Sequence, residues 1–318
     1  MRLITLDEIR DVVPKLDPLD VMEQAFIAYS SGKAVIPPVG ELIFDDPSGD
    51  VHIKYGYLKG DDYYVVKIAS GFYGNPSLGL PSSNGMMLLF DRRTGNTLAV
   101  ILDEGYLTDV RTAAAGAVTV RHLGPGHIEQ IGVIGSGNQA RLQLSYISQA
   151  TSCKRALVWG RTPTHVKRYQ EEMVEQGMEI EVAANPQEVA AACRVIVTTT
   201  PSKRPLLDAQ DVEQGTHIVA VGSDSSEKQE LDAKILGKAD LVVADSIPQC
   251  LERGEISHAL RAGFIRQREL VELGKLISGE HEGRTSDEQI TVADLTGVAV
   301  QDIAISKAVF EALARKEI

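Results

Sequence analysis

The stretch that decides the fold is residues 131–140, IGVIGSGNQA. An apolar, strand-like run ends there in a G-x-G-x-x-A pattern, and a helical pattern follows over 139–149. The first glycine of this pattern permits a tight strand-to-helix turn, the second lets a pyrophosphate approach the backbone, and the alanine allows close helix packing. The N–H groups that begin the helix then face the phosphates. In this context the motif predicts dinucleotide binding, with a glycine turn that holds no ligand as the alternative.

Short β-branched runs alternate with helical stretches after this motif. Helical patterns cover 164–176 and 187–192, and strand-like runs cover 131–135, 156–159, 180–183, 195–199, 217–221 and 241–244. Buried β-branched runs separated by helices are typical of a parallel sheet that is covered on both faces. The pattern predicts a doubly wound Rossmann dinucleotide-binding domain over 126–297.

The first 125 residues have a different pattern. A helix is expected over 6–31, and period-two alternation between turn signals follows over 41–44, 51–57, 63–68, 86–90 and 97–102. This alternation predicts a largely antiparallel sheet. Helices are expected over 107–120, leading into the Rossmann domain, and over 298–315. The predicted fold class is therefore α/β: a Rossmann domain plus an α+β domain made of residues 1–125 with 298–318.

Composition limits the classes of function. A chain of 318 residues is long enough for two domains, and its net charge of −12 argues against a nucleic-acid partner. No run of about 20 apolar residues could span a membrane, and the N-terminal MRLITLDEIR lacks the apolar core of a signal peptide. Cys153, Cys193 and Cys250 show no C-x-x-C spacing, so neither structural zinc nor a disulfide framework is expected. We expect no bound metal and a cytoplasmic location.

The second predicted Rossmann strand bears on the choice of nicotinamide cofactor. NAD-selective folds place an acidic residue near the end of this strand, where it binds the ribose 2′-hydroxyl. Here the strand ends in Gly160, Arg161 and Thr162, without an acid. A guanidinium can bind a 2′-phosphate through two hydrogen bonds, and Thr162 can add a hydroxyl. We therefore expect a preference for NADP(H); a solvated Arg161 with NAD(H) held by other contacts is the alternative.

Further motifs extend over nearly the whole chain. They are Val66-Lys67-Ile68, Gly79-Leu80-Pro81, LTDVRTAAA at 107–115, Thr198-Thr199-Thr200-Pro201, Val221-Gly222-Ser223-Asp224, KQELD at 228–232 and Asp294-Leu295-Thr296-Gly297. With the glycine motif, they make the chain resemble the ornithine cyclodeaminase/mu-crystallin family, which includes cyclodeaminases, archaeal-type alanine dehydrogenases and ketimine reductases. The resemblance implies an N-terminal substrate-binding and dimerisation domain, a homodimer, and chemistry on an α-amino or α-imino acid at the nicotinamide ring.

The resemblance also implies three residues that carry the chemistry. Lys67 matches the family's active-site lysine, although its spacing alone suggests a surface lysine. Arg111 matches the arginine that binds the substrate carboxylate; an ion pair with a neighbouring acid is the alternative. Asp224, after the fifth Rossmann strand, matches the catalytic aspartate, with the capping of a helix as the alternative. The residues expected to bind the cofactor, from the motifs and the resemblance together, are Thr112, Gly135, Ser136, Gly137, Asn138, Gln139, Ala140, Gly160, Arg161, Thr162, Thr199, Thr200, Pro201, Val221, Gly222, Ser223, Thr296 and Gly297.

The chain departs from the pattern of the family's cyclodeaminases at two places. Where they have a glutamate for the substrate's terminal amino group, this chain has His52, and Val39-Gly40 replace a basic residue after the paired prolines. Lys54, on the same strand face as His52 by the period of two, can supply that positive charge. These changes favour a substrate without a distal ammonium, or with a second anionic group. A solvent-facing His52 is the alternative, and Glu41 could restore a diamine site.

These observations favour an NAD(P)H-dependent oxidoreductase that acts on the C–N bond of an α-imino or α-amino acid, in the manner of a ketimine reductase or an alanine dehydrogenase. One alternative is a cyclodeaminating lyase, which would release ammonia from a diamino acid and recycle NAD. The other is a protein that binds nucleotide without turnover, but the presence of Lys67, Arg111 and Asp224 argues against it.

Overall fold

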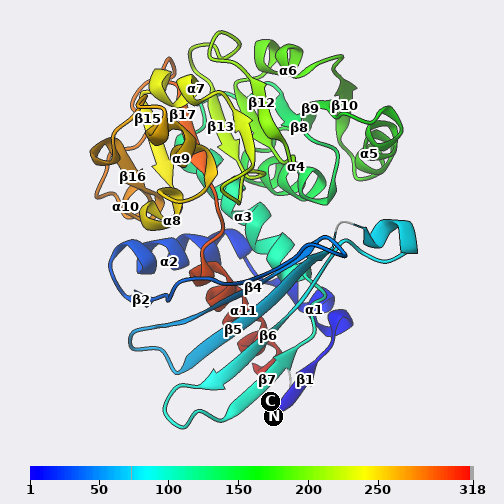
Figure 1. Cartoon of the computed structure of the whole chain (residues 1–318), viewed down its shortest axis with the longest axis vertical. Helices are drawn as coiled ribbons and strands as arrows, with labels where there is room; N and C mark the ends of the chain where they lie inside the picture. The colour runs from blue at the N-terminus through cyan, green and yellow to red at the C-terminus, as the bar shows by residue number, and fades with distance from the viewer. Residues whose placement is uncertain (73, 316–318) are drawn as a thin grey trace. The chain divides into compact units, whose positions relative to one another are not determined.

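The computed structural model describes residues 1–72 and 74–315, and the chain divides into two compact units (Figure 1). Unit 1 consists of Met1–Arg111 with Ala299–Ile318, and unit 2 of Thr112–Val298. The first division falls inside α3 (Tyr106–Leu123), whereas the sequence places the boundary after this helix. The second division falls immediately before α11 (Ala299–Arg315). No helix among the described residues is both long enough and apolar enough to cross a membrane.

Unit 2 is built on an eight-stranded sheet in which every neighbouring pair is parallel. Its strands, in spatial order, are β10 (Glu179–Val182), β9 (Arg155–Trp159), β8 (Ile131–Ile134), β11 (Val195–Thr198), β13 (His217–Ala220), β17 (Thr291–Asp294), β15 (Leu241–Ala244) and β16 (Leu270–Glu272). All residues of β8, β11, β13, β15 and β17 are buried, which explains why most of them are apolar. The strand order reverses between β8 and β11, and ligands of such folds bind at the carboxyl ends of the strands beside this point.

The helices of unit 2 are α4 (Asn138–Thr151), α5 (Pro163–Glu175), α6 (Pro186–Ala192), α7 (Ala233–Lys238), α8 (Ile247–Cys250), α9 (Gly254–Arg261) and α10 (Leu273–Ile277). A separate parallel pair joins β12 (Lys203–Leu207) to β14 (Gln229–Leu231). Side chains cap several helices: Asn185 begins α6, Asp232 begins α7 and Ser246 begins α8. These polar residues accept the N–H groups that a helix leaves unpaired at its start, and so set where each helix begins.

Unit 1 is built on a seven-stranded sheet with the order β1 (Arg2–Ile4), β7 (Thr97–Ile101), β6 (Ser83–Asp91), β5 (Tyr63–Phe72), β4 (Gly49–Leu58) and β2 (Ala34–Val35), with β3 (Gly40–Phe44) also paired to β4. All of its pairs are antiparallel except β1 with β7. Its helices, besides α11, are α1 (Leu6–Val12), η1 (Val13–Lys15), α2 (Pro18–Ser30) and η2 (Asn75–Leu78).

The single helix expected over 6–31 is broken in the structure. The chain leaves the α-helical conformation between Val12 and Pro18, because Pro14 cannot donate the hydrogen bond that would continue α1. Asp17 then starts α2 by accepting the N–H groups of Leu19 and Asp20 at 3.1 and 3.2 Å. Pro18 occupies the first position of the new helix, where its missing donor costs nothing.

The two faces of the unit 1 sheet differ. On the inner face the buried side chains of Val65, Met87 and Leu89 alternate along the strands, and α11 packs across them (Figure 1). The Ser306 hydroxyl of α11, for example, donates to the Met87 sulfur at 2.7 Å. The other face, called here the outer sheet face, carries half-buried or exposed apolar side chains that the strand registers place side by side: Leu3, Val100, Leu88, Val66 and Tyr55 in one row, and Met86, Ile68 and Ile53 in the next.

Candidate functional site

A pocket in unit 2 lies at the carboxyl ends of β8, β9 and β11 and has a volume of about 260 Å³. Three loops and the first turn of α5 form it. Its lining residues are Gly135, Ser136, Gly137, Trp159, Gly160, Arg161, Thr162, His165, Thr199, Thr200, Pro201, Ser202 and Leu206. The pocket therefore joins the glycine loop to the two neighbouring strand ends, where a Rossmann fold binds its dinucleotide.

The two glycines after β8 have different reasons to lack a side chain. Gly135 has φ +129°, and a Cβ there would lie 2.3 Å from the Thr199 Oγ1 atom, so the protein itself requires glycine. A Cβ on Gly137 would meet no atom of residues 1–72 or 74–315 within 4 Å. Gly137 is also the N-cap of α4, where free N–H groups favour an anion. The residues present therefore fit the pyrophosphate of a dinucleotide.

Arg161 lines the pocket at the end of β9, and its side chain is exposed. Within the part of the chain that the structure describes, no carboxylate pairs with it. The two other guanidinium groups of this region, those of Arg141 and Arg168, are paired with Glu172 at 2.5 and 2.6 Å. Their hydrogen bonds, from Arg168 first, hold the pKa of Glu172 below its usual value. Arg161 is thus the arginine of this region whose charge is available to a ligand.

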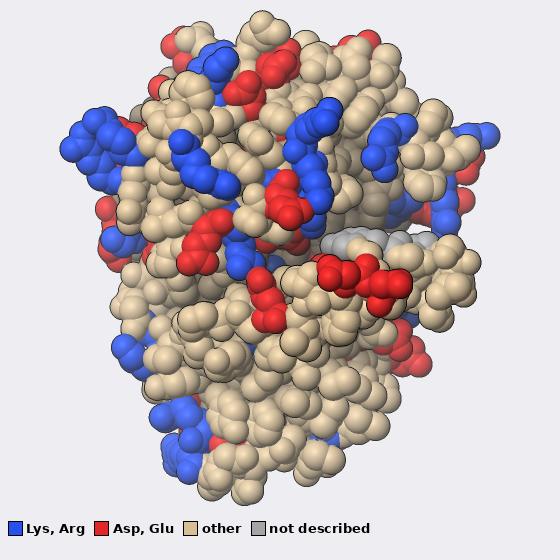
Figure 2. Space-filling view, in the orientation of Figure 1, with Lys and Arg blue, Asp and Glu red and all other residues tan. Residues whose placement is uncertain are grey.

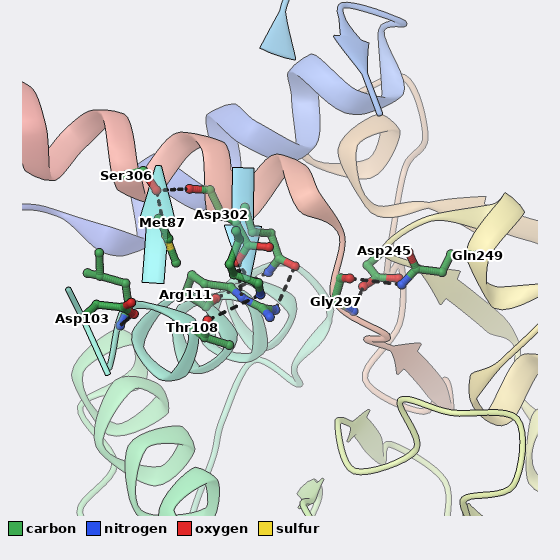
Figure 3. Close-up of polar contacts among 12 residues, drawn as sticks. Met87, Asp103, Thr108, Arg111, Asp245, Gln249, Gly297, Asp302 and Ser306 are labelled. Atoms are coloured by element: carbon green, nitrogen blue, oxygen red, sulfur yellow. Dashed lines mark hydrogen bonds and ion pairs between the residues drawn. The ribbon is translucent and has the colours of Figure 1, made fainter. Parts of the chain in front are cut away.

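The other residues expected to bind cofactor lie around this pocket or on later strand ends. Asn138 lines an adjoining hollow, Gln139 lies in the first turn of α4, and Ala140 is fully buried. Val221, Gly222 and Ser223 follow β13. Thr296 and Gly297 follow β17 and are held by Asp245. Asp245 accepts the Thr296 hydroxyl at 3.0 Å. It also accepts the Gly297 N–H at 2.7 Å (Figure 3). The backbone oxygen of Thr112 accepts a hydrogen bond from Gln143.

Trp159, His165, Ser202 and Leu206 also line the pocket but were not among the expected residues. Trp159 and Ser202 directly adjoin expected residues, Gly160 and Pro201, so proximity in sequence was the available signal. His165 lies one turn into α5 and Leu206 on β12, and only the folded chain brings them to the pocket.

Unit 1 contains a buried cluster of charged side chains, formed by Lys67, Arg111 and Asp302. Figure 3 shows Arg111 beside Asp302. Lys67, on β5, is 2% exposed, and its Nζ atom donates to Asp302 Oδ1 at 3.0 Å and to the Thr108 hydroxyl at 3.4 Å. The Nε atom of Arg111, on α3, lies 3.2 Å from the same Asp302 oxygen. The Arg111 Nη1 atom also donates to Gln301 at 3.2 Å. One carboxylate oxygen thus orients both cations.

Burial and charge act together on this cluster. Burial lowers the pKa of Lys67; Asp302 opposes this effect and the Arg111 guanidinium adds to it. Burial alone would raise the pKa of Asp302, but Lys67, Arg111 and Lys54 outweigh it and the pKa is lowered. Three cations therefore act on the Asp302 carboxylate, and the carboxyl group of Asp103 is the second acidic group that acts on Lys67. This excess of positive charge suits an anionic ligand such as a carboxylate.

Two buried acceptor atoms beside these cations have no hydrogen-bond partner among the described residues. The Asp302 Oδ2 atom makes none, and neither does the Oδ1 atom of Asp103, whose other oxygen accepts the Leu107 N–H at 2.9 Å. Burial raises the pKa of Asp103. Unpaired buried acceptors are costly, so both atoms are suited to accept from a ligand N–H group.

Asp302 is the member of this cluster that the sequence analysis missed. It lies in α11, 235 positions from Lys67. The available signal was the polar pair Gln301-Asp302 within the otherwise apolar stretch VAVQDIAI at 298–305. Such a pair on a buried helix indicates either a function or a buried ion pair.

His52 and Lys54 lie on the inner face of β4, where Lys54 is directly opposite Lys67. The His52 ring lies between two carboxylates, with Nδ1 3.5 Å from Glu41 and Nε2 3.4 Å from Asp50. Glu41 on β3 is opposite His52 in register and therefore shares this face. The strand thus presents basic and acidic groups side by side.

Asp224 lies in unit 2, in the loop after β13. Its side chain is 56% exposed and pairs with the Nζ atom of Lys228 at 2.6 Å. The structure thus brings Lys67 and Arg111 together within unit 1, whereas Asp224 belongs to the other unit.

The doubly wound sheet and the glycine turn are those of a Rossmann-type dinucleotide-binding fold. The model of the ornithine cyclodeaminase/mu-crystallin family matches residues 5–317, and the chain belongs to this family. The predicted family and fold class are thereby confirmed.

Individual relatives support this membership. The chain is 41% identical over 315 residues to an uncharacterized cyclodeaminase of Sinorhizobium fredii, covering 98% of this chain and 95% of that protein. The structure of an archaeal alanine dehydrogenase dimer with bound NAD is similar with a TM-score of 0.91 and 34% identity, over 99% and 97% of the two chains. The Δ1-pyrroline-2-carboxylate reductase of Thermococcus litoralis, in complex with NADH and L-proline, gives a TM-score of 0.93 and 27% identity, over 100% and 99%.

Proposed function

We propose that this protein is an NAD(P)H-dependent oxidoreductase that reduces the C=N bond of an α-imino acid, either a cyclic ketimine or the imine formed from an oxo acid and ammonia. The observation that carries the proposal is the buried Lys67–Arg111–Asp302 cluster, with its excess of positive charge and its unpaired acceptors. The similarity to an alanine dehydrogenase and to a pyrroline-2-carboxylate reductase supports the same reaction class.

In this proposal each residue has a defined task. The Arg111 fork binds the substrate carboxylate through two parallel hydrogen bonds. The unpaired Asp302 oxygen accepts an N–H of the imine or amine. The bound reduced nicotinamide supplies a hydride to the α-carbon, and the imine nitrogen takes up one proton to give the amine. Lys67, whose pKa burial lowers, or a water held by Asp224 donates that proton.

We further propose that NADP(H) is preferred. Arg161 lines the dinucleotide pocket without a carboxylate partner among the described residues, and Thr162 adjoins it. A guanidinium at this position binds a 2′-phosphate, whereas an acidic residue would repel it. NAD(H), which the related alanine dehydrogenase structure contains, is the alternative cofactor.

A cyclodeaminase is the second candidate. Glu41 shares the inner face of the unit 1 sheet with His52 and lies 3.5 Å from its ring. A carboxylate there could bind the terminal ammonium of a diamino acid. The relative with 41% identity also carries the name of a cyclodeaminase.

We also propose that the protein forms a homodimer through the outer sheet face. One row of apolar side chains crosses five strands there and a second row crosses three. The part of this face over β5 and β6 is almost free of charged side chains (Figure 2). Contiguous exposed apolar surface of this kind marks an interaction site. The related alanine dehydrogenase is described as a dimer.

The test of the proposed reaction is a spectrophotometric assay. Purified protein is mixed with NADPH or NADH and offered pyrroline-2-carboxylate, or pyruvate with ammonia, while the reduced-nicotinamide absorbance is followed. We expect absorbance to fall, faster with NADPH, and the variant Arg111→Lys to raise the KM for the imino acid because one ammonium cannot replace the planar fork. Ammonia released from ornithine with only catalytic NAD, and without net oxidation of NADPH, would instead show a cyclodeaminase.

A further inference from the structure

The loops around the dinucleotide pocket are backed by a buried carboxylate that the proposed reaction does not use. Glu230, on β14, is fully buried in unit 2. An ionised side chain is placed in such an environment only when several donors compensate for the lost water. Its partners therefore indicate what the residue does.

Glu230 accepts hydrogen bonds from two separate loops. Its Oε1 atom accepts the N–H of Thr200 at 2.5 Å, in the loop after β11. Its Oε2 atom accepts the N–H of Gly222 at 2.9 Å, in the loop after β13, and the Thr198 hydroxyl at 2.7 Å. One side chain thus links the ends of two neighbouring parallel strands.

Both linked loops carry residues of the proposed site. Thr200 lines the dinucleotide pocket, and Gly222 lies two residues before Asp224. The loops are in direct contact, because a Cβ on Gly222 would lie 2.2 Å from the Thr200 oxygen and 2.6 Å from the Glu230 carboxyl carbon. The space between the loops thus accommodates the Glu230 carboxylate but no additional side chain.

Glu230 is itself held in place from behind. Its backbone N–H donates to Glu255 Oε1 on α9 at 2.7 Å, and the next N–H, of Leu231, donates to the other oxygen of Glu255 at 3.3 Å. The pairing of β14 with β12 fixes the backbone on the other side. The backbone that carries the carboxylate is therefore fixed on both sides, and the carboxylate has a defined position.

We propose that Glu230 is a positioning residue whose ionised carboxylate ties the Thr200 loop to the Gly222 loop and so holds the dinucleotide pocket and the Asp224 segment in the geometry that binds cofactor. This inference rests on the proposed function, because it takes the pocket to be the cofactor site. A carboxylate is required because both loop donors are backbone N–H groups and need an acceptor at each oxygen. A glutamine would turn its own NH₂ group toward one of them.

The charge of Glu230 is finely balanced. Burial raises its pKa to about 7, and hydrogen bonds from Thr198, Thr200 and Gly222 work against that rise. The titratable group that acts on Glu230 directly is Glu255 on α9, which accepts the Glu230 N–H. Asp294 on β17 acts on Glu255 in turn. His258 contacts the backbone oxygen of Lys228, and Lys203 on β12 pairs with Glu227. Protonation of Glu230 below neutral pH would remove one acceptor and loosen the link.

The test is direct titration of the full-length protein with NADPH and NADH by nucleotide fluorescence, without substrate. We expect Glu230→Gln to weaken nucleotide binding about tenfold, the usual effect of losing one hydrogen bond to a charged group. The matched control is Thr198→Val, which removes the third donor to the same carboxylate but leaves both bonds that join the loops. Because Thr198 belongs to β11 and not to either loop, its loss should lower the stability of the fold, while nucleotide affinity stays within about twofold of the parent. Between pH 8 and 6 the parent should lose affinity, and the glutamine variant should lose less.

The inference would be overturned if Glu230→Gln bound nucleotide as tightly as the parent. It would also be overturned if Glu230→Gln and Thr198→Val lost nucleotide affinity equally and had equally lowered melting temperatures. If the glutamine variant does not fold, Glu230→Asp takes its place. It keeps the charge but is one methylene too short to reach both loops, so it should weaken binding in the same direction, and unchanged affinity would overturn the inference. A parent that binds nucleotide but reduces no imino acid would contradict the proposed function and leave this inference standing; a parent that binds no nucleotide would overturn both.

Discussion

At the scale of single residues, a glycine can be required by the protein or by its ligand, and the two glycines after β8 represent the two cases. The Thr199 hydroxyl leaves no room for a side chain on Gly135, whereas no protein atom limits one on Gly137. The sequence motif does not distinguish these reasons. The structure does, and it makes Gly137 a selective probe of nucleotide binding.

We expect Gly137→Ala to leave the melting temperature nearly unchanged and to weaken NADPH binding by about tenfold or more, because the added methyl group takes the place of a phosphate at the start of α4. Gly135→Ala should instead lower the melting temperature, since its φ of +129° and its contact with Thr199 both disfavour a side chain. Thermal melting and fluorescence titration of both variants check this pair. If Gly137→Ala bound NADPH with the parent's affinity, the pyrophosphate would not bind beside Gly137.

Asp302 provides a second prediction at this scale, through the proton affinity of Lys67. Asp302 raises the pKa of Lys67 against the effect of burial, so Asp302→Asn should lower that pKa further. If Lys67 must be protonated for reduction, the alkaline limb of the kcat/KM profile should move to lower pH. Glu311→Gln, also on α11, is the control and should leave the profile in place. If the alkaline limb of the Asp302→Asn profile stayed in place or moved to higher pH, Lys67 would not be the proton donor.

At the scale of elements, the two faces of the unit 1 sheet explain why its sequence alternates imperfectly. The inner face is buried by α11, and the outer sheet face is apolar as well. A sheet with one wet face would show apolar and polar residues in strict alternation. The apolar outer sheet face thus indicates that something other than water covers it.

Ile68→Lys places a charge at the centre of the outer sheet face, beside Ile53 and Met86. We expect the variant to fold but to run as a monomer, because an ammonium there can reach water in the free chain but not in the proposed dimer interface. Analytical ultracentrifugation measures the result. Val174→Lys, at an exposed apolar position of α5, is the control and should keep the parent's oligomeric state. A dimeric Ile68→Lys protein would place the interface elsewhere.

At the scale of the whole molecule, the sequence predicts what depends on local patterns and fails where distant segments meet. The glycine motif and the buried β-branched runs predict a Rossmann fold, because each feature is contained within one βα unit. By contrast β17, which lies between β13 and β15, was not expected: its four residues TVAD begin and end with the polar side chains of Thr291 and Asp294, which obscure the apolar run typical of a buried strand. Its place in the sheet comes from its neighbours, not from its own sequence.

The same limit applies to the candidate site. The burial of Lys67 depends on Asp302 in the last helix, and the role of Glu230 depends on two loops that precede it in the chain. No local pattern around Lys67 distinguishes a buried lysine from a solvated one. The family resemblance identified Lys67 and Arg111 as candidates, whereas their shared partner emerged only from the folded chain.

The position of α11 in unit 1 has a consequence for how the protein is made. The strands β1–β7 are synthesised first, but the helix that covers their inner face is encoded at the far end of the chain, after the whole of unit 2. At about 5–20 residues per second, the ribosome needs roughly 10–40 s to supply it. During that interval unit 2 can complete its own sheet, while the nascent unit 1 exposes apolar strands on both faces. Chaperones that shield such strands on the ribosome should therefore increase the yield of this protein.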